Sequence, residues 1–455
     1  MKAGCWIICL FLGVGSVYAQ EPLELSEAIK RCLEKNYEIE IQEGLVEQAE
    51  NNNSWGEAGR FPSLNLSVSQ TNRASDAIKV GSPFQPLGVT ISNSLDPQVN
   101  LNWVLFDGFR ANITEDRLEQ LQFETQGNAD IVLSNTLQAL ILAYYRTSLE
   151  QERLEVFENT LKLSRDKYQY LQSKQSYGAA VTSDVLLEEG NYLTDSVNFI
   201  NQQLTYKKSF RELNRLMVAK NPNETYELGV LEAPMNSYEY TDLEQKALAG
   251  NIDLKKKYVS QSIIKHEIEL SRASSYPKFS MDVNAGTSIG QTDFSNAEFF
   301  DQTTREYVSG PSDPQSTVTN NYGLNFSITY NLFNGKKVNR AIKNALIREN
   351  IGDLEIESMK YSLQTDLRNA LDEYQIRQQI YFINKRKMES AKLNLQISEE
   401  KFKLGAINSF DFRTVQINYI TAALQELNSR FGLKESELNL MRLTGGILEV
   451  YANNP

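Results

Sequence analysis

The sequence predicts a mainly α-helical protein with a transmembrane β part, built by tandem duplication of one unit. Three observations lead to this fold class. Two long segments, 108–175 and 335–402, contain no proline and one internal glycine each, which favours uninterrupted helices. Four short segments alternate strictly between apolar and polar residues, as strands do. Finally, a set of residues recurs at a constant offset, which indicates an internal repeat.

The N-terminal segment 1–19 predicts an export signal. Lys2 supplies a positive charge, a short apolar run follows, and Val17-Tyr18-Ala19 has the small-residue pattern that precedes cleavage. The mature chain is expected to begin near Gln20. Because two of the three cysteines lie in the signal, only Cys32 would remain, and no intrachain disulfide is expected.

Composition excludes several classes of function. The chain of 455 residues has a net charge of -12 and no dense basic cluster, which argues against binding to nucleic acid. His266 is the only histidine, so one chain cannot build a catalytic triad around histidine or a site of several histidines. There is also no phosphate-binding glycine loop and no metal-binding cysteine spacing. We therefore expect neither an enzyme nor a cofactor.

The duplication is visible as pairs of equivalent residues. Asn36 and Asn251 lie 215 residues apart, whereas Leu105-Phe106-Asp107-Gly108 and Leu332-Phe333-Asn334-Gly335 lie 227 residues apart. The second copy therefore carries 12 additional residues, between Pro277 and Phe333. We predict a first repeat over 20–217, a breaker-rich connector over 218–235 and a second repeat over 236–455.

Each repeat is expected to supply two strands of membrane-spanning length. The alternation follows Pro62 and Pro277 and returns before each Leu-Phe-Asx-Gly motif. The polar segments Thr71–Asp96 and Thr287–Asn320, between the paired strands, suit external loops. A soluble sheet with one face on a core remains open as an alternative, because alternation is a weak signal for each single segment. The side chains predicted to face lipid are Leu64, Leu66, Val68, Leu101, Trp103, Phe279, Met281, Val283, Phe326, Ile328 and Tyr330.

The two proline-free segments would each form a helix of about 100 Å. Apolar residues at three-four spacing within the first, and at Leu193, Val197, Ile200 and Leu204 in the returning segment, predict a coiled-coil seam. The arms 183–217 and 25–60 are each about half as long, so two of them would pair with one long helix. A soluble coiled-coil spacer would explain the helices but not the strands.

These motifs, in this order and duplicated, resemble the TolC-like outer-membrane efflux protein family over essentially the whole mature chain. The resemblance rests on Phe61-Pro62 and Tyr276-Pro277, the two Leu-Phe-Asx-Gly motifs, and the paired segments 177–184 and 404–411. It implies a homotrimer with a shared 12-stranded β-barrel in the outer membrane, continued by a helical barrel in the periplasm. It also implies a passive conduit, in a tripartite efflux pump or a type I secretion system, that meets a periplasmic adaptor and an inner-membrane transporter.

The resemblance also assigns roles at two turns between helices. Gly178 with Asp184, and Gly405 with Asp411, match the periplasmic tips at which adaptors dock, although these residues could equally serve as helix caps. Phe402 and Asp411 match positions of the family's gate. Because Ile407 and Thr414 depart from its charged pattern, Arg413 is predicted as a substitute partner for Asp411.

One alternative from another class remains open at this point. A periplasmic coiled-coil scaffold or adaptor without a membrane barrel would share the long helices, and its strands would pack on a soluble core. The sequence does not distinguish drugs, metals or proteins as cargo.

Overall fold

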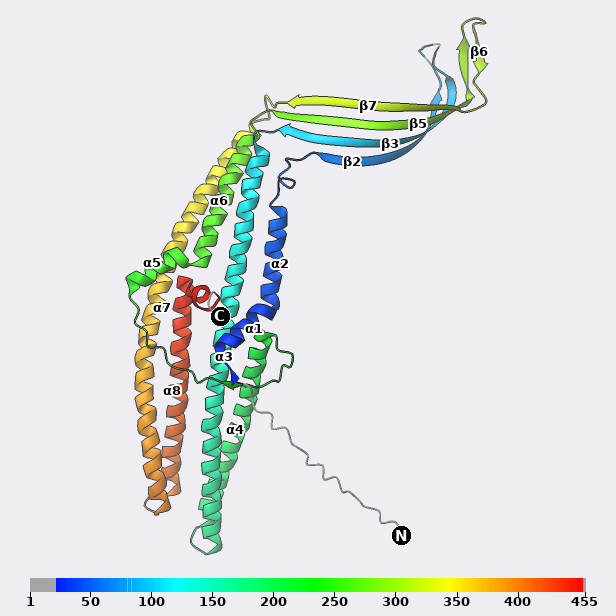
Figure 1. Ribbon diagram of the computed structural model, residues 1–455. Helices are drawn as coiled ribbons and strands as arrows, with labels where there is room; N and C mark the ends of the chain where they lie inside the picture. Colours follow the sequence, from blue (N-terminus) through cyan, green and yellow to red (C-terminus); the bar gives the residue numbers. More distant parts are fainter. Residues whose placement is uncertain (1–21, 80, 83, 453–455) are drawn as a thin grey trace, which may run out of the picture. The chain divides into compact units, whose positions relative to one another are not determined.

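Two helices of equal length dominate the chain in the computed structural model, which describes residues 22–79, 81–82 and 84–452. Helices α3 (Arg110–Ser176) and α7 (Lys337–Lys403) each contain 67 residues (Figure 1). They agree with the predicted runs to within two residues. The predicted export signal lies outside the described residues.

Each long helix turns back into a helix about half its length. Helices α4 (Thr182–Met217) and α8 (Ser409–Thr444) contain 36 residues each. Both end in a left-handed residue, Val218 with φ 50° and Gly445 with φ 76°. These helices and their boundaries therefore repeat at the offset of 227 found in the sequence.

The prediction of one continuous helical arm over 25–60 is wrong. The arm is divided into α1 (Leu25–Lys35) and α2 (Tyr37–Asn52), and the second repeat is divided in the same way into α5 (Tyr240–Gly250) and α6 (Ile252–Ala273). The break falls at an asparagine in each repeat. A polar residue that bonds outside its own helix offers the backbone an alternative to helix continuation.

Asn36 and Asn251 make equivalent contacts. The Asn36 side-chain amide donates to the Leu216 carbonyl at 2.9 Å, and the Asn251 amide donates to the Leu443 carbonyl at 3.0 Å. Both asparagines have extended backbone and are buried. Each amide thus satisfies a carbonyl at the C-terminal end of the returning helix, where intrahelical donors are lacking.

The chain divides into two compact units, which do not follow the repeats. Of the described residues, 22–44, 127–255 and 357–452 form one unit, and those within 45–126 and 256–356 form the other. In the first, a core around Leu137, Leu140 and Ile141 contains the short parallel strands β1 (Pro22–Leu23) and β4 (Glu227–Leu228).

The second unit contains an antiparallel sheet. Its order is β2 (Ser63–Ala77), β3 (Leu87–Phe106), β5 (Lys278–Asp301) and β7 (Gln315–Thr329), and β6 (Glu306–Ser309) pairs with the last residues of β5. Figure 1 shows the four long strands side by side.

The predicted external loops Thr71–Asp96 and Thr287–Asn320 are wrong in extent, because the strands continue far into both. Ser75 pairs with Thr90, and Gln291 pairs with Ser316. In β2 and β7 the side chains of these extensions are mainly small and polar, so the apolar alternation ends before the strand does, whereas β3 keeps Val89, Ile91 and Leu95. Backbone hydrogen bonds hold the ladder where the apolar signal is absent.

Candidate functional site

The sheet has one apolar and one polar face. Leu64, Leu101, Val283 and Leu324 form one cross-strand row, and the neighbouring row on the opposite face consists of Asn65, Asn100, Asn284 and Gly323. Ten of the eleven residues predicted to face lipid lie on the apolar face by this register, and Tyr330 follows the end of β7. That these side chains contact lipid stays a prediction.

The apolar band has the height of a bilayer core. It extends along β5 from Phe279, opposite Ile328, to Ile289, opposite Val318. Ten residue steps cover about 34 Å along the strand, and a strand tilted by about 45° would span about 24 Å of height. Outer-membrane strands expose an apolar band of about 25 Å. Beyond Ile289 most side chains of the sheet are polar, and β3 alone continues the apolar alternation, with Ile91 and Val89.

Both outer strands of the sheet are open edges. Within the part of the chain that the structure describes, β2 pairs with β3 alone and β7 pairs with β5 alone. A row of unpaired backbone donors and acceptors is costly in lipid, where water cannot satisfy it.

Two exposed turns, one between α3 and α4 and the other between α7 and α8, begin at glycines. Gly178 has φ 73° and Gly405 has φ 74°, a left-handed conformation that disfavours other residues. After each glycine, the next amide bonds back to the helix: Ala179 to the Lys174 carbonyl and Ala406 to the Lys401 carbonyl, both at 2.8 Å. The two predicted tips are therefore helix C-caps of the same type.

The acidic residues of the two turns start the returning helices. Asp184 and Asp411 lie in the first turns of α4 and α8, where a negative charge is favourable. The second tip has an additional cap, because the Asn408 side chain accepts from the Asp411 backbone amide at 2.8 Å. Their capping position agrees with the geometry predicted from sequence, and an adaptor contact stays a prediction.

A buried lysine near the tips joins the two helical hairpins, one formed by α3 and α4 and the other by α7 and α8. Lys167 of α3 forms an ion pair with Glu188 of α4 at 2.8 Å and donates to the Ser409 carbonyl of α8 at 3.1 Å. Its ammonium lies 4.9 Å from the ring centroids of both Phe402 and Phe412. Burial lowers the pKa of Lys167 below its ordinary 10.5, and the bond to Glu188 opposes that shift.

Arg413 occupies a second buried polar cluster. It donates to both carboxylate oxygens of Asp195, at 2.6 and 2.8 Å, and to the Gln416 side chain at 3.0 Å. Ser164 donates to the same Asp195 carboxylate and links the pair to α3. The predicted partnership of Arg413 with Asp411 is therefore wrong: a bidentate pair with a buried carboxylate on α4 uses the guanidinium fork fully.

Phe402 is partly buried between the hairpins, and Asp411 is exposed. The Phe402 ring stacks on Phe412 at 5.3 Å and meets Tyr170 edge-on at 6.3 Å. Of the three candidate gate residues, Phe402 and Arg413 thus tie the second hairpin to the first, and Asp411 does not share these contacts.

Sequence reasoning missed Lys167, Glu188 and Asp195. The available signal was the polar series Glu188, Asp195 and Gln202, which recurs every seven residues on α4 and is buried in the structure. The predicted seam at Leu193, Val197, Ile200 and Leu204 is wrong as a contact within the chain, since these side chains are 49–61% exposed. Inside the chain, α4 packs through this polar series over its first two-thirds and through Phe210, Leu213 and Met217 at its C-terminal end.

Two absences apply to the described residues. None of the helices resolved between 22 and 452 combines the length and apolarity required to cross a membrane. Over the same part of the chain, histidine, cysteine and acidic side chains do not gather into a group suited to a metal ion.

Comparisons with known proteins agree with this architecture. Residues 243–446 match the family model described as outer membrane efflux protein. A search of curated protein sequences gives no match.

Solved structures give the same fold. The Campylobacter jejuni CmeC outer membrane channel superposes with a TM-score of 0.72 at 16% identity, over 93% of this chain and 85% of that chain. The open-state MtrE outer membrane channel of Neisseria gonorrhoeae gives 0.70 at 14% identity, over 93% and 89%. The outer membrane protein VceC of Vibrio cholerae gives 0.70 at 12% identity, over 93% and 96%.

A sheet with an apolar band and two long helical hairpins are the features that this chain shares with the fold of outer membrane channels. The match to the outer membrane efflux protein model covers most of the second repeat, and the fold of the outer membrane channels is shared over more than nine-tenths of the chain.

Proposed function

We propose that three copies of this chain form one duct, which receives cargo from an inner-membrane transporter through a periplasmic adaptor. The observation that carries the assembly is the sheet with four long strands, an apolar band and two open edges. Four strands are too few to close a barrel, and outer-membrane barrels begin at about eight strands. Three copies would supply 12 strands and leave no edge.

The helical unit offers a matching argument. Helix α4 exposes the stripe Leu193, Val197, Ile200 and Leu204, and α7 exposes Ile376, Ile380 and Ile383 at three-four spacing. Apolar stripes of this length are unusual on a monomer and suit helix packing. In a ring of copies, α4 of one chain would pack against α7 of the next.

Native mass spectrometry of the purified protein tests this assembly. We expect a mass of three mature chains, and Ile200→Glu should lower the temperature at which the trimer dissociates. Asn201→Glu, on the next residue of α4 and also exposed, is the matched control. A stable monomer, or equal effects of the two variants, would contradict the α4–α7 seam.

The gate proposal rests on the contacts between the hairpins. Lys167, Phe402 and Arg413 tie the second hairpin to the first, so releasing them should let the second tip move outward. In planar bilayers, Arg413→Ala should raise the mean single-channel conductance. Asp411→Asn should reduce the preference for cations. Arg215→Ala, which removes an exposed ion pair on α4, is the control. Unchanged conductance and selectivity would remove the gate role.

Adaptor contact at the tips is supported by exposed apolar side chains. Tyr177 and Leu404 are 87% and 83% exposed beside Gly178 and Gly405, and such groups often mark protein contacts. A photo-crosslinking residue at Tyr177 in cells should capture a periplasmic protein, whereas one at exposed Ser173, one turn back on α3, should not. Equal capture at both positions would argue against tip docking.

A further inference from the structure

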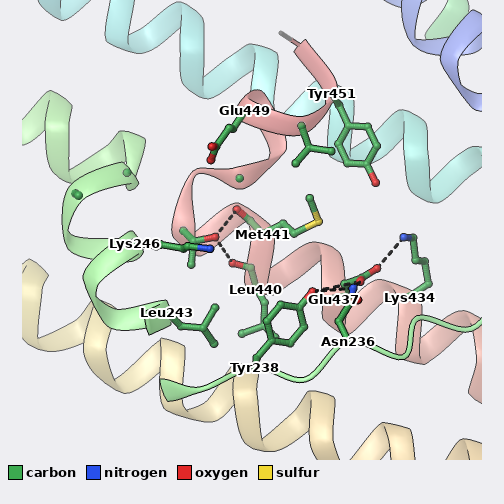
Figure 2. Close-up of a pocket in the computed structure, with 15 residues that line it drawn as sticks. Asn236, Tyr238, Leu243, Lys246, Lys434, Glu437, Leu440, Met441, Glu449 and Tyr451 are labelled. Atoms are coloured by element: carbon green, nitrogen blue, oxygen red, sulfur yellow. Dashed lines mark hydrogen bonds and ion pairs between the residues drawn. The ribbon is translucent and has the colours of Figure 1, made fainter. Parts of the chain in front are cut away.

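A hollow lies in the first of the two compact units, where α5 approaches the C-terminal end of α8 (Figure 2). Its volume is about 660 Å³, which falls in the range of about 300–1,000 Å³ of small-molecule sites. Leu243, Leu440, Met441 and Val450 give it an apolar wall. The rings of Tyr238 and Tyr451 also line it. None of the tip residues takes part.

One end of the hollow is a polar cluster around a buried carboxylate. Glu437 accepts from the Asn236 amide at 2.7 Å, the Tyr238 hydroxyl at 3.3 Å and the Lys434 ammonium at 2.7 Å. Glu437 is 4% exposed. Figure 2 shows these bonds among the residues that line the pocket. The cluster presents fixed donors and acceptors beside an apolar surface.

The first repeat shows which residue type is sufficient for folding at the position of Glu437. At the offset of 227, Glu437 corresponds to Phe210 and Lys434 to Lys207. Phe210 is 1% exposed and packs edge-on against Tyr206 at 5.0 Å, so it acts as a plug. The hollow that remains there is about 300 Å³. Since an aromatic plug fits, the buried charges of the second repeat are not required by the fold.

A second substitution keeps the hollow of the second repeat open. Asn214 donates to the carbonyls of Pro222 at 3.1 Å and Glu224 at 2.8 Å, which holds the connector against α4. Its equivalent is Met441, whose thioether cannot donate. After Gly445 the chain instead forms the π-helix η1 (Leu448–Ala452), which supplies another wall.

We infer that this pocket binds an amphipathic small molecule without net charge. The apolar part would lie on Leu243, Met441 and Val450, and the polar part would hydrogen-bond to the Glu437 cluster. The lining carries two cations, Lys246 and Lys434, and two anions, Glu437 and Glu449, so its formal charge cancels. A ligand with net charge would leave one charge uncompensated.

A labelling-protection experiment tests the pocket in the assembled protein held in amphipol. Val450→Cys places a thiol at the rim, where Val450 is 47% exposed, and the native Cys32 is buried. Octyl glucoside below its micelle concentration should slow the reaction of this thiol with a maleimide at least fivefold, with saturation. Octyl sulfate and octyltrimethylammonium should slow it less.

Two further variants separate the pocket from unspecific partitioning. In the same background, Met441→Trp should fill the hollow and abolish protection, and Met441→Leu should retain it. A thiol at Ser173→Cys, an exposed residue near the first tip, should show no slowing. Protection that does not saturate, that survives Met441→Trp or that appears at Ser173→Cys would overturn the inference. Stronger protection by either charged probe would overturn the charge assignment.

Discussion

Removing Asp195 should release the start of α8. The Asp195 side chain is 3% exposed and that of Arg413 is 14% exposed, so the pair is nearly dry. Breaking a buried pair from one side costs about 3–5 kcal/mol, because the other charge stays buried without its partner. Gln416 still accepts from Arg413, which favours the lower end, about 3 kcal/mol. At 1.36 kcal/mol for each factor of ten, local opening should increase about 150-fold in Asp195→Ala.

Hydrogen exchange followed by mass spectrometry measures this opening directly. Amides in the first three turns of α8 should exchange faster by about that factor, and those around Leu438 should not change. Arg413→Ala should act in the same direction, and the double variant should cost less than the sum. Glu212→Ala breaks an exposed pair with Arg215 on α4 and serves as control. Unchanged exchange at the start of α8 in Asp195→Ala would refute this account of the contact between hairpins.

Three further predictions concern stability and reactivity. Lys167→Met should destabilise the protein by about 3 kcal/mol in urea unfolding, because Glu188 stays buried without its partner. The double variant Lys167→Met with Glu188→Leu should recover most of this loss, because both buried charges are removed. A double variant as unstable as the single one would contradict this. Burial raises the pKa of Cys32 to about 11 from 9.0. At pH 8 a thiol reagent should therefore react about 100-fold more slowly with Cys32 in the native protein than in the unfolded protein. Because the thiol ionises at lower pH in the unfolded protein, its contribution to stability falls as pH rises above 9. Gly250→Ala should lower the melting temperature more than Gly352→Ala. A Cβ at residue 250 would lie 2.4 Å from the backbone carbonyl oxygen of Thr444, whereas a Cβ at residue 352 would meet the movable side-chain amide of Gln261. A larger loss for Gly352→Ala would show that α5 shifts freely.

The long helices were predictable because nothing in their sequence interrupts them. Neither long segment contains proline, and Gly352, the internal glycine of α7, lies where a Cβ would meet the Gln261 amide. The strands were predictable where apolar residues alternate, whereas the polar extensions of β2 and β7 depend on backbone pairing that leaves no periodic signal. The break at Asn36 depends on a bond to Leu216, 180 residues away, which local sequence cannot reveal.

The site was harder to predict because apolar periodicity does not say which molecule the stripe contacts. Leu193, Val197, Ile200 and Leu204 have the spacing of a seam, but the face of α4 that packs within the chain carries Glu188, Asp195 and Gln202. Proximity in sequence likewise favoured Asp411 as the partner of Arg413. On a helix, residues two apart point in different directions, so the partner came from another helix.

The equal lengths of the paired helices constrain how this protein can change. Deleting one residue within α3 or α7 would shorten it by about 1.5 Å and rotate every following side chain by about 100°. A deletion in α3 before Lys167 would then take its ammonium out of the phase in which it meets the Phe402 ring of α7. The 12 residues by which the repeats differ fall between Pro277 and Phe333, which includes β5 and β7, where added strand and turn leave the helical phase intact. Length variation should therefore be tolerated in the sheet and its turns and rejected in the helices.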